Sequence, residues 1–108
     1  MLLERARRVA DQGEYALAAD LCQAVLVIDP ASADAYFILG MVSECQDNAE
    51  AAGHFWRRCV YLQPDHYDAL CHLALLAENT GAAAQASAFR QRAARVYGRR
   101  DGATRKQS

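Results

Sequence analysis

The chain has 108 residues, 53% of them hydrophobic and only two of them proline, so it is long enough for one small domain and too apolar to be disordered throughout. Its net charge of −1 conceals a split: residues 1–89 hold 5 basic and 12 acidic side chains, and residues 90–108 hold 7 basic and 1 acidic. The acidic body favours cationic partners. Nucleic-acid bases stack on aromatic side chains, and Tyr97 is the only aromatic residue among the arginines of the basic end. No nucleic-acid partner is therefore expected.

Membrane insertion and secretion are not expected either. No apolar run approaches the roughly 20 residues that a membrane-spanning helix needs, and the first eight residues lack the apolar core of a signal peptide. The four cysteines show no CxxC spacing, which predicts reduced thiols, two of them filling the core, rather than a disulfide or a zinc site. We therefore expect a cytoplasmic protein with free thiols at Cys22, Cys45, Cys59 and Cys71.

The apolar periodicity predicts six helices that form three pairs. In chain order they cover residues 2–11 and 15–28, then 33–46 and 49–62, then 67–79 and 82–97. Ser32 and Asp65 are expected to cap the third and fifth helices, and Gly98 is expected to end the sixth. Residues 99–108 would then form a basic, disordered tail.

The helix pairs recur with a spacing of 34 residues. Pro30 and Pro64 follow two second helices, and Gly98 stands one further step along. The small residues Ala18, Ala52 and Ala86 and the turn residues Gly13, Asp47 and Gly81 keep the same spacing. This predicts an all-α domain over residues 1–98, with helix-turn-helix repeats at about 1–30, 31–64 and 65–98 stacked as a short right-handed superhelix, an α-solenoid.

Stripes of apolar and small residues mark the expected core. One helix of the second pair carries Tyr36, Leu39, Gly40 and Ser43 at i, i+3, i+4 and i+7, and its partner carries Ala52, Trp56 and Cys59. The third pair repeats the first stripe at Leu70, Leu73, Ala74 and Ala77. Arg90 takes the position of Trp56 in the third pair, which is typical of the polar outer face of a terminal repeat.

Catalytic, cofactor-binding and metal-binding residues are not predicted. Cys71 and His72 are adjacent on a helix, so their side chains diverge by about 100° and cannot act as a nucleophile and its base. His54 and His66 lie near expected helix starts, where we expect them to be exposed. The chain has no Gly-rich phosphate loop, HExxH or GxSxG motif. A binding module without a cofactor is therefore favoured over an enzyme.

The candidate partner-binding surface lies on the first helix of each pair, because those helices line the concave side of such an array. Its apolar strip consists of Phe37, Met41 and Leu75 and is edged by the carboxylates of Asp34, Glu44, Asp68 and Glu78. Such a surface suits an amphipathic helix or extended peptide with basic edges, and Phe37 and Met41 are the expected anchors. Alternatively, some of these apolar groups only pack between neighbouring repeats. The predicted groove residues are Leu3, Arg7, Asp34, Phe37, Met41, Glu44, Cys45, Asp68, Cys71, Leu75, Glu78 and Asn79.

Two stretches resemble known families. The run Tyr36-Phe37-Ile38-Leu39-Gly40, with the spaced alanines, turn residues and prolines, resembles tetratricopeptide repeats over about nine tenths of the chain. The segment from Ala51 to Arg95, and above all Tyr61-Leu62-Gln63-Pro64-Asp65, is similar to the C-terminal repeat domain of bacterial CheR-type chemoreceptor methyltransferases. Within that family it resembles the WspC branch, from a surface-sensing pathway that controls cyclic-di-GMP synthesis.

This resemblance implies a docking or regulatory arm of a protein-glutamate methyltransferase that uses S-adenosylmethionine. The arm would contact the chemoreceptor, the enzyme's own catalytic domain or another signalling protein. No part of the family's catalytic domain is present in the sequence, so no catalytic or cofactor residue is carried over. Two alternatives stay open: a small stand-alone secretion chaperone that shields a hydrophobic helix of a client subunit, and weak self-association through the first helix.

Overall fold

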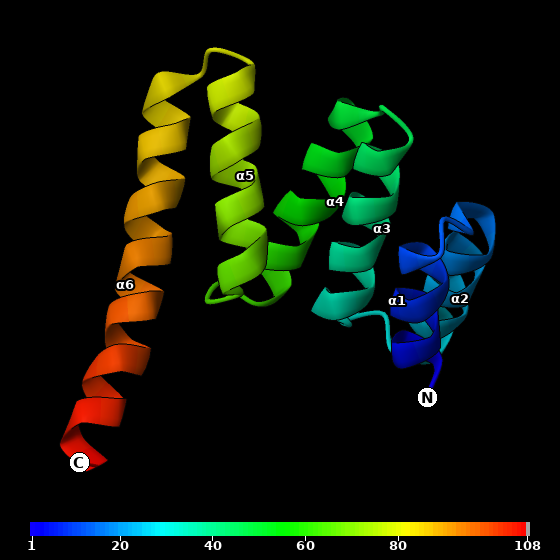
Figure 1. Ribbon diagram of the computed structural model, residues 1–108, viewed down its shortest axis with the longest axis horizontal. Coiled ribbons are helices and arrows are strands. Elements are labelled where there is room, and N and C mark those ends of the chain that lie inside the picture. The colour runs from blue at the N-terminus through cyan, green and yellow to red at the C-terminus, as the bar shows by residue number, and fades with distance from the viewer. Residues whose placement is uncertain (108) are drawn as a thin grey trace. The chain divides into compact units, whose positions relative to one another are not determined.

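The structure is a computed structural model that describes the backbone of residues 1–107 and the side chains of residues 1–99. Within this part of the chain all regular structure is helical (Figure 1), which confirms the all-α fold class. Four of the helices have the predicted bounds, and α3 ends one residue earlier than expected. The helices are α1 (Leu2–Asp11), α2 (Tyr15–Ile28), α3 (Ala33–Cys45), α4 (Ala49–Leu62), α5 (Tyr67–Asn79) and α6 (Ala83–Gln107).

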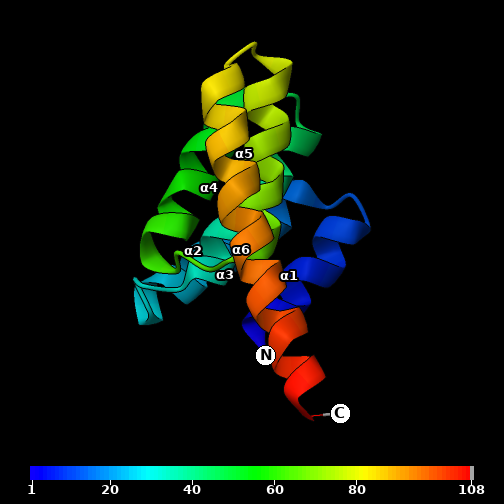
Figure 2. The same cartoon turned by 90° about the vertical axis from the view of Figure 1, so that its left-hand side faces the viewer.

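The helices belong to two compact units, which we describe separately. The first unit, Met1–Pro64, holds α1 to α4, and the second unit, Asp65–Ser108, holds α5 and α6. In the first unit α1 packs on α2, α3 packs on α4, and α3 also contacts both helices of the preceding pair. In the second unit α5 and α6 run side by side in both views (Figures 1 and 2). Each predicted helix pair is thus a packed hairpin.

The turns inside the three hairpins share one backbone conformation. Gly13, Asp47 and Gly81 stand 34 residues apart and all have positive φ values, of 83°, 59° and 78°. Glycine adopts this left-handed conformation without steric cost, and aspartate is among the few other residues that tolerate it. The 34-residue spacing read from the sequence therefore corresponds to a repeated structural unit.

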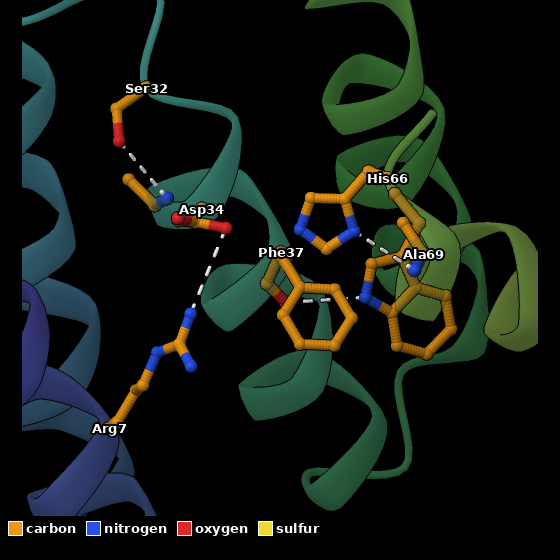
Figure 3. Close-up of polar contacts among 8 residues, drawn as sticks. Arg7, Ser32, Asp34, Phe37, His66 and Ala69 are labelled. Carbon is orange, nitrogen blue, oxygen red and sulfur yellow. Dashed lines mark hydrogen bonds and ion pairs between the residues drawn. The ribbon is translucent and has the colours of Figure 1, made fainter. Parts of the chain in front are cut away.

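Side chains cap the starts of three helices. The hydroxyl of Ser32 accepts a hydrogen bond from the N–H of Ala35 at 3.3 Å, as predicted, and Asn48 caps α4 in the same way. The prediction of Asp65 as the cap of α5 is wrong. His66 takes that position and accepts the Ala69 N–H through Nδ1 at 3.2 Å (Figure 3). His66 is buried, so the expectation that it is exposed is also wrong.

The second hairpin is organised around Trp56. Its side chain is fully buried, and its indole N–H donates a hydrogen bond to the carbonyl oxygen of Phe37 at 3.2 Å. A Cβ placed on Gly40 would lie 2.3 Å from the Trp56 Nε1 atom, so only glycine leaves room for the ring. Gly40, which lies in the predicted core stripe, therefore packs against an indole. Ser43 is buried and satisfied, because its hydroxyl donates to the carbonyl of Leu39 at 2.9 Å.

The second unit has its own apolar core between α5 and α6. Leu70 and Leu73 are at most 1% exposed, and α6 contributes three further buried apolar side chains. The rings of Tyr67 and Tyr97 lie 5.9 Å apart at the side of this core. The predicted stripe on α5 is confirmed as core, and the residues that α6 supplies to it are Ala86, Ala93 and Val96.

The prediction that Gly98 ends the last helix is wrong. Helix α6 continues through Gly98 to Gln107 and projects past the end of α5 (Figures 1 and 2), so the expected disordered tail is helical over residues 99–107. The reason is that glycine permits a helix end without forcing one, and the residues that follow include several good helix formers. The last residue, 108, lies outside the described part. Among the described helices, none has both the length and the apolar character that crossing a bilayer requires.

Candidate protein-binding site

A small apolar hollow lies between α1 and α3 in the first unit. It has a volume of about 230 Å³, which suits one large apolar side chain of a ligand. Phe37 and Met41, the two predicted anchors, both line it and are half-buried. The other lining residues are Arg7, Ala10, Asp11 and Ile38. The structure thus brings together three of the predicted groove residues, Arg7, Phe37 and Met41.

The hollow is held in place by contacts on both sides. From α1, the guanidinium of Arg7 reaches the carboxylate of Asp34 on α3 at 3.7 Å (Figure 3). Beneath α3, the Trp56 indole N–H is bonded to the carbonyl of Phe37, which ties the anchor residue to the buried core. Because α1 and α3 are packed against each other and against the core, the hollow exists without a bound ligand.

The predicted groove residues of the second unit lie on α5. Leu75 is 56% exposed and so offers an apolar surface, whereas Cys71 is half-buried and shares a side-chain hydrogen bond with Tyr67, which raises the pKa of that phenol. Glu78 forms an ion pair with Arg90 of α6. Asp68 and Asn79 are exposed. A continuous groove that joins these residues to the hollow of the first unit stays a prediction.

Two of the four carboxylates that edge the predicted apolar strip are engaged in ion pairs within the protein. Asp34 is paired with Arg7, and Glu78 is paired with Arg90. Glu44 and Asp68 are exposed and form no ion pair with a described residue. The unpaired carboxylates are therefore the ones that a basic ligand can engage without first breaking an internal pair.

Some residues fall elsewhere than sequence reasoning placed them. Leu3 lines a different hollow, of about 370 Å³, formed with Met1, Leu2, Val25, Ile28 and Asp29. Cys45 is exposed at the end of α3, where its hydrogen bond to Tyr15 raises the pKa of the Tyr15 phenol. Ala10, Asp11 and Ile38 of the first hollow were missed. The spacing of Ala10 and Asp11, three and four residues from Arg7, places them on its helix face and could have identified them.

Two of the four cysteines, Cys22 and Cys59, are unsuited to nucleophilic chemistry in the folded chain. Burial raises the pKa of the Cys22 thiol to about 11, and burial followed by the nearby Asp34 carboxylate raises that of Cys59 to about 12. Both thiols stay neutral near pH 7, where a reactive cysteine needs its thiolate. They are core fillers, as predicted. Within the described residues, no cluster of three potential metal ligands occurs.

These two thiols predict a loss of stability in alkali. The same thiols ionise near pH 9 when unperturbed, as in the unfolded chain. Between pH 9 and 11 the unfolded chain therefore releases protons that the folded chain keeps, and stability falls as the pH rises. We expect a free energy of unfolding about 2–4 kcal/mol lower at pH 10.5 than at pH 8. Urea unfolding, monitored by circular dichroism at both pH values, measures this difference. A Cys22→Ala/Cys59→Ala variant should show a much flatter pH dependence, and an equally steep one would contradict the assignment.

Comparisons with known proteins point to one kind of repeat and one group of enzymes. No protein-family model matches the chain. It is 38% identical over 95 residues to the probable biofilm formation methyltransferase WspC of Pseudomonas putida, and 38% identical over 88 residues to that of Pseudomonas aeruginosa. These matches cover 88% and 82% of the chain but only 22% and 21% of the relatives' own length. The chain thus spans about a fifth of the curated relatives it matches, in their C-terminal region.

Solved structures agree on the fold. MamA from Desulfovibrio magneticus superposes with a TM-score of 0.80 at 20% identity, over 93% of this chain and 56% of that one. The Yersinia enterocolitica type III secretion chaperone SycD, in complex with a peptide of the translocator YopD, gives 0.78 at 20% identity, over 88% and 72% of the two chains. At such low identity these likenesses show the fold alone. The chain thus has a tetratricopeptide-type helical-repeat fold, and its sequence resembles the C-terminal region of the WspC methyltransferases.

Proposed function

We propose that the chain is a protein-docking arm of a cytoplasmic, WspC-like protein-glutamate methyltransferase, and that its first unit binds a helix or extended peptide of a chemosensory partner. The observation that carries this proposal is the preformed hollow between α1 and α3. It offers an apolar floor to one anchor side chain, and Asp11 and the exposed Glu44 provide carboxylates on the same two helices. Amphipathic peptides with basic edges are bound by surfaces of this composition.

The sequence similarity to WspC supports the proposal that the chain belongs to a chemosensory methyltransferase. In this proposal the methyl group passes from S-adenosylmethionine to receptor glutamates in the rest of the enzyme, and the repeat domain contributes no catalytic or cofactor group. The domain raises the local concentration of the enzyme at its receptor or holds the catalytic domain in place, because a tethered second contact increases affinity without new chemistry.

The experiment removes the two anchors. In Phe37→Ala/Met41→Ala the floor of the hollow is lost, and we expect binding of the receptor's cytoplasmic fragment, measured by calorimetry, to weaken about tenfold or more. The matched control is Leu17→Ala/Val27→Ala, which removes two exposed apolar side chains from α2, outside the hollow. Circular dichroism verifies that both variants stay helical. Unchanged affinity in the folded anchor variant would exclude the hollow as the binding site.

A second candidate is a secretion chaperone, which the similarity to SycD favours, since SycD was solved with a translocator peptide. Binding of the unchanged chain to two ligands, the receptor fragment and a hydrophobic segment of a secreted subunit, separates the two. A chaperone would bind a hydrophobic segment of a secreted subunit through Phe37 and Met41 and would show no affinity for the receptor fragment. A docking arm would show the reverse preference.

A further inference from the structure

An arginine held between two tyrosine rings stands on the outer side of the first unit. The guanidinium carbon of Arg58 lies 5.4 Å from the ring centre of Tyr61 and 5.9 Å from that of Tyr36. Tyr36 in turn packs near Phe55, with ring centres 6.4 Å apart, and Phe55 meets the edge of His54 at 5.9 Å. We call this group, with Arg57, the arginine–aromatic patch. It consists of Tyr36, His54, Phe55, Arg57, Arg58 and Tyr61.

The α4 side of the patch faces solvent, whereas Tyr36 of α3 and Phe55 are half-buried beneath it. His54, Arg58 and Tyr61 follow one another at i, i+4 and i+7 and therefore form one stripe along the helix. The opposite stripe, with Trp56 and Cys59, is fully buried. His54, Arg57 and Arg58 are exposed, and Tyr61 is 70% exposed. The stripe lies outside the hollow between α1 and α3.

The two arginines keep their guanidinium groups exposed to solvent. Neither Arg57 nor Arg58 forms an ion pair or a hydrogen bond with a described residue, whereas Arg7 and Arg90 are each paired with a carboxylate. Each guanidinium offers five N–H donors in a fixed fork that matches a carboxylate. Stacking on the tyrosine faces restricts the Arg58 side chain in advance, which lowers the entropy lost when an anion binds its edge.

We infer that the arginine–aromatic patch is a second docking surface, which binds an acidic segment of a partner protein. Arg57 and Arg58 hold carboxylates of that segment, and the exposed face of Tyr61 receives its apolar side chains. The charge of the surroundings favours a short acidic segment over a nucleic acid. The first unit has 5 basic and 9 acidic residues, a net of −4, so a long phosphate backbone passing beyond the two arginines is repelled.

This surface adds to the proposed function and does not depend on it. The hollow selects an apolar anchor with basic neighbours, while the patch selects acidic residues with aromatic or aliphatic neighbours. A partner could therefore be held at two places by segments of opposite charge.

The test uses a fluorescein-labelled peptide of repeated Glu-Glu-Phe triplets and the isotope-labelled chain. We expect the peptide to shift the backbone amide signals of Arg57, Arg58 and Tyr61, and its affinity to fall about tenfold in Arg57→Gln/Arg58→Gln. The matched control, Arg5→Gln/Arg8→Gln, changes the net charge equally at two exposed arginines of α1 and should bind within about twofold of the unchanged chain.

Three results would overturn the inference. The first is an absence of peptide binding to the unchanged chain. The second is an equal loss of affinity in both arginine variants, which would show that net charge alone attracts the peptide. The third is tighter binding of single-stranded oligothymidylate than of the peptide, with the same dependence on Arg57 and Arg58, which would assign the patch to nucleic acid. A peptide with glutamine in place of glutamate should not bind.

Discussion

Gly40→Ala is expected to destabilise the first unit more than any exposed substitution, although alanine is the better helix former. The added Cβ would lie 2.3 Å from Nε1, 2.5 Å from Cδ1 and 2.7 Å from Cε2 of the Trp56 indole. The ring is rigid and fully buried, so it cannot move aside cheaply. Overpacking of this kind typically costs about 1–3 kcal/mol. Displacement of the indole would also weaken its hydrogen bond to the Phe37 carbonyl, which contributes about 1 kcal/mol.

The gain in helix propensity offsets about 1 kcal/mol of this loss, so we expect a net decrease of about 2 kcal/mol in the free energy of unfolding. Urea titration by circular dichroism measures it. The control is Gly98→Ala, a helical glycine with no neighbouring atom within 4 Å of the added Cβ, which should gain stability from propensity alone. Adding Trp56→Phe to Gly40→Ala should restore part of the loss through the smaller ring. Equal stabilisation by both glycine substitutions would mean that the close contact does not exist.

Leu70→Ala is expected to be as damaging in the second unit, and Leu75→Ala to be nearly silent. Both residues are leucines of α5, but Leu70 is fully buried and Leu75 is 56% exposed. Truncation of a buried leucine loses transfer free energy and leaves a cavity, with a cost of about 2–5 kcal/mol. Truncation of a half-exposed leucine should change stability by about 0.5 kcal/mol or less.

The comparison is made by thermal unfolding of the two variants beside the unchanged chain. Because the substitution and the helix are the same in both, the difference between them measures burial alone. A loss of stability in Leu75→Ala as large as in Leu70→Ala would show that Leu75 is covered, and it would remove Leu75 from the predicted apolar strip. If Leu75→Ala is silent, it becomes the variant of choice for testing partner binding at the second unit.

Part of the hollow could be read from the sequence because it depends on helix register. Phe37 and Met41 are four residues apart on one predicted helix, so their shared face follows from helix geometry, and both line the hollow. The ion pairs could not be read in this way. Whether Asp34 stays available to a ligand depends on Arg7, which is distant in sequence and reaches it only after α1 and α3 have packed. The pairing of Glu78 with Arg90 has the same origin.

The sequence by itself determined the properties that rest on local interactions: the six helices, the 34-residue period, the left-handed turns at Gly13, Asp47 and Gly81 and the cap at Ser32. These arise from backbone propensity and from contacts a few residues apart, which leave a pattern along the chain. The same period places His66 where Ser32 stands one repeat earlier. Applied to the start of α5, it predicts His66 as the cap, as the structure shows.

Only the tertiary structure decided which side chains meet. It assigned Gly40 to the Trp56 indole, separated Leu3 from the hollow of Phe37 and Met41, and left the guanidinium of Arg58 between two tyrosine rings. Most of these contacts join residues of different helices, and their partners depend on helix packing and on side-chain direction, neither of which is encoded in a local pattern.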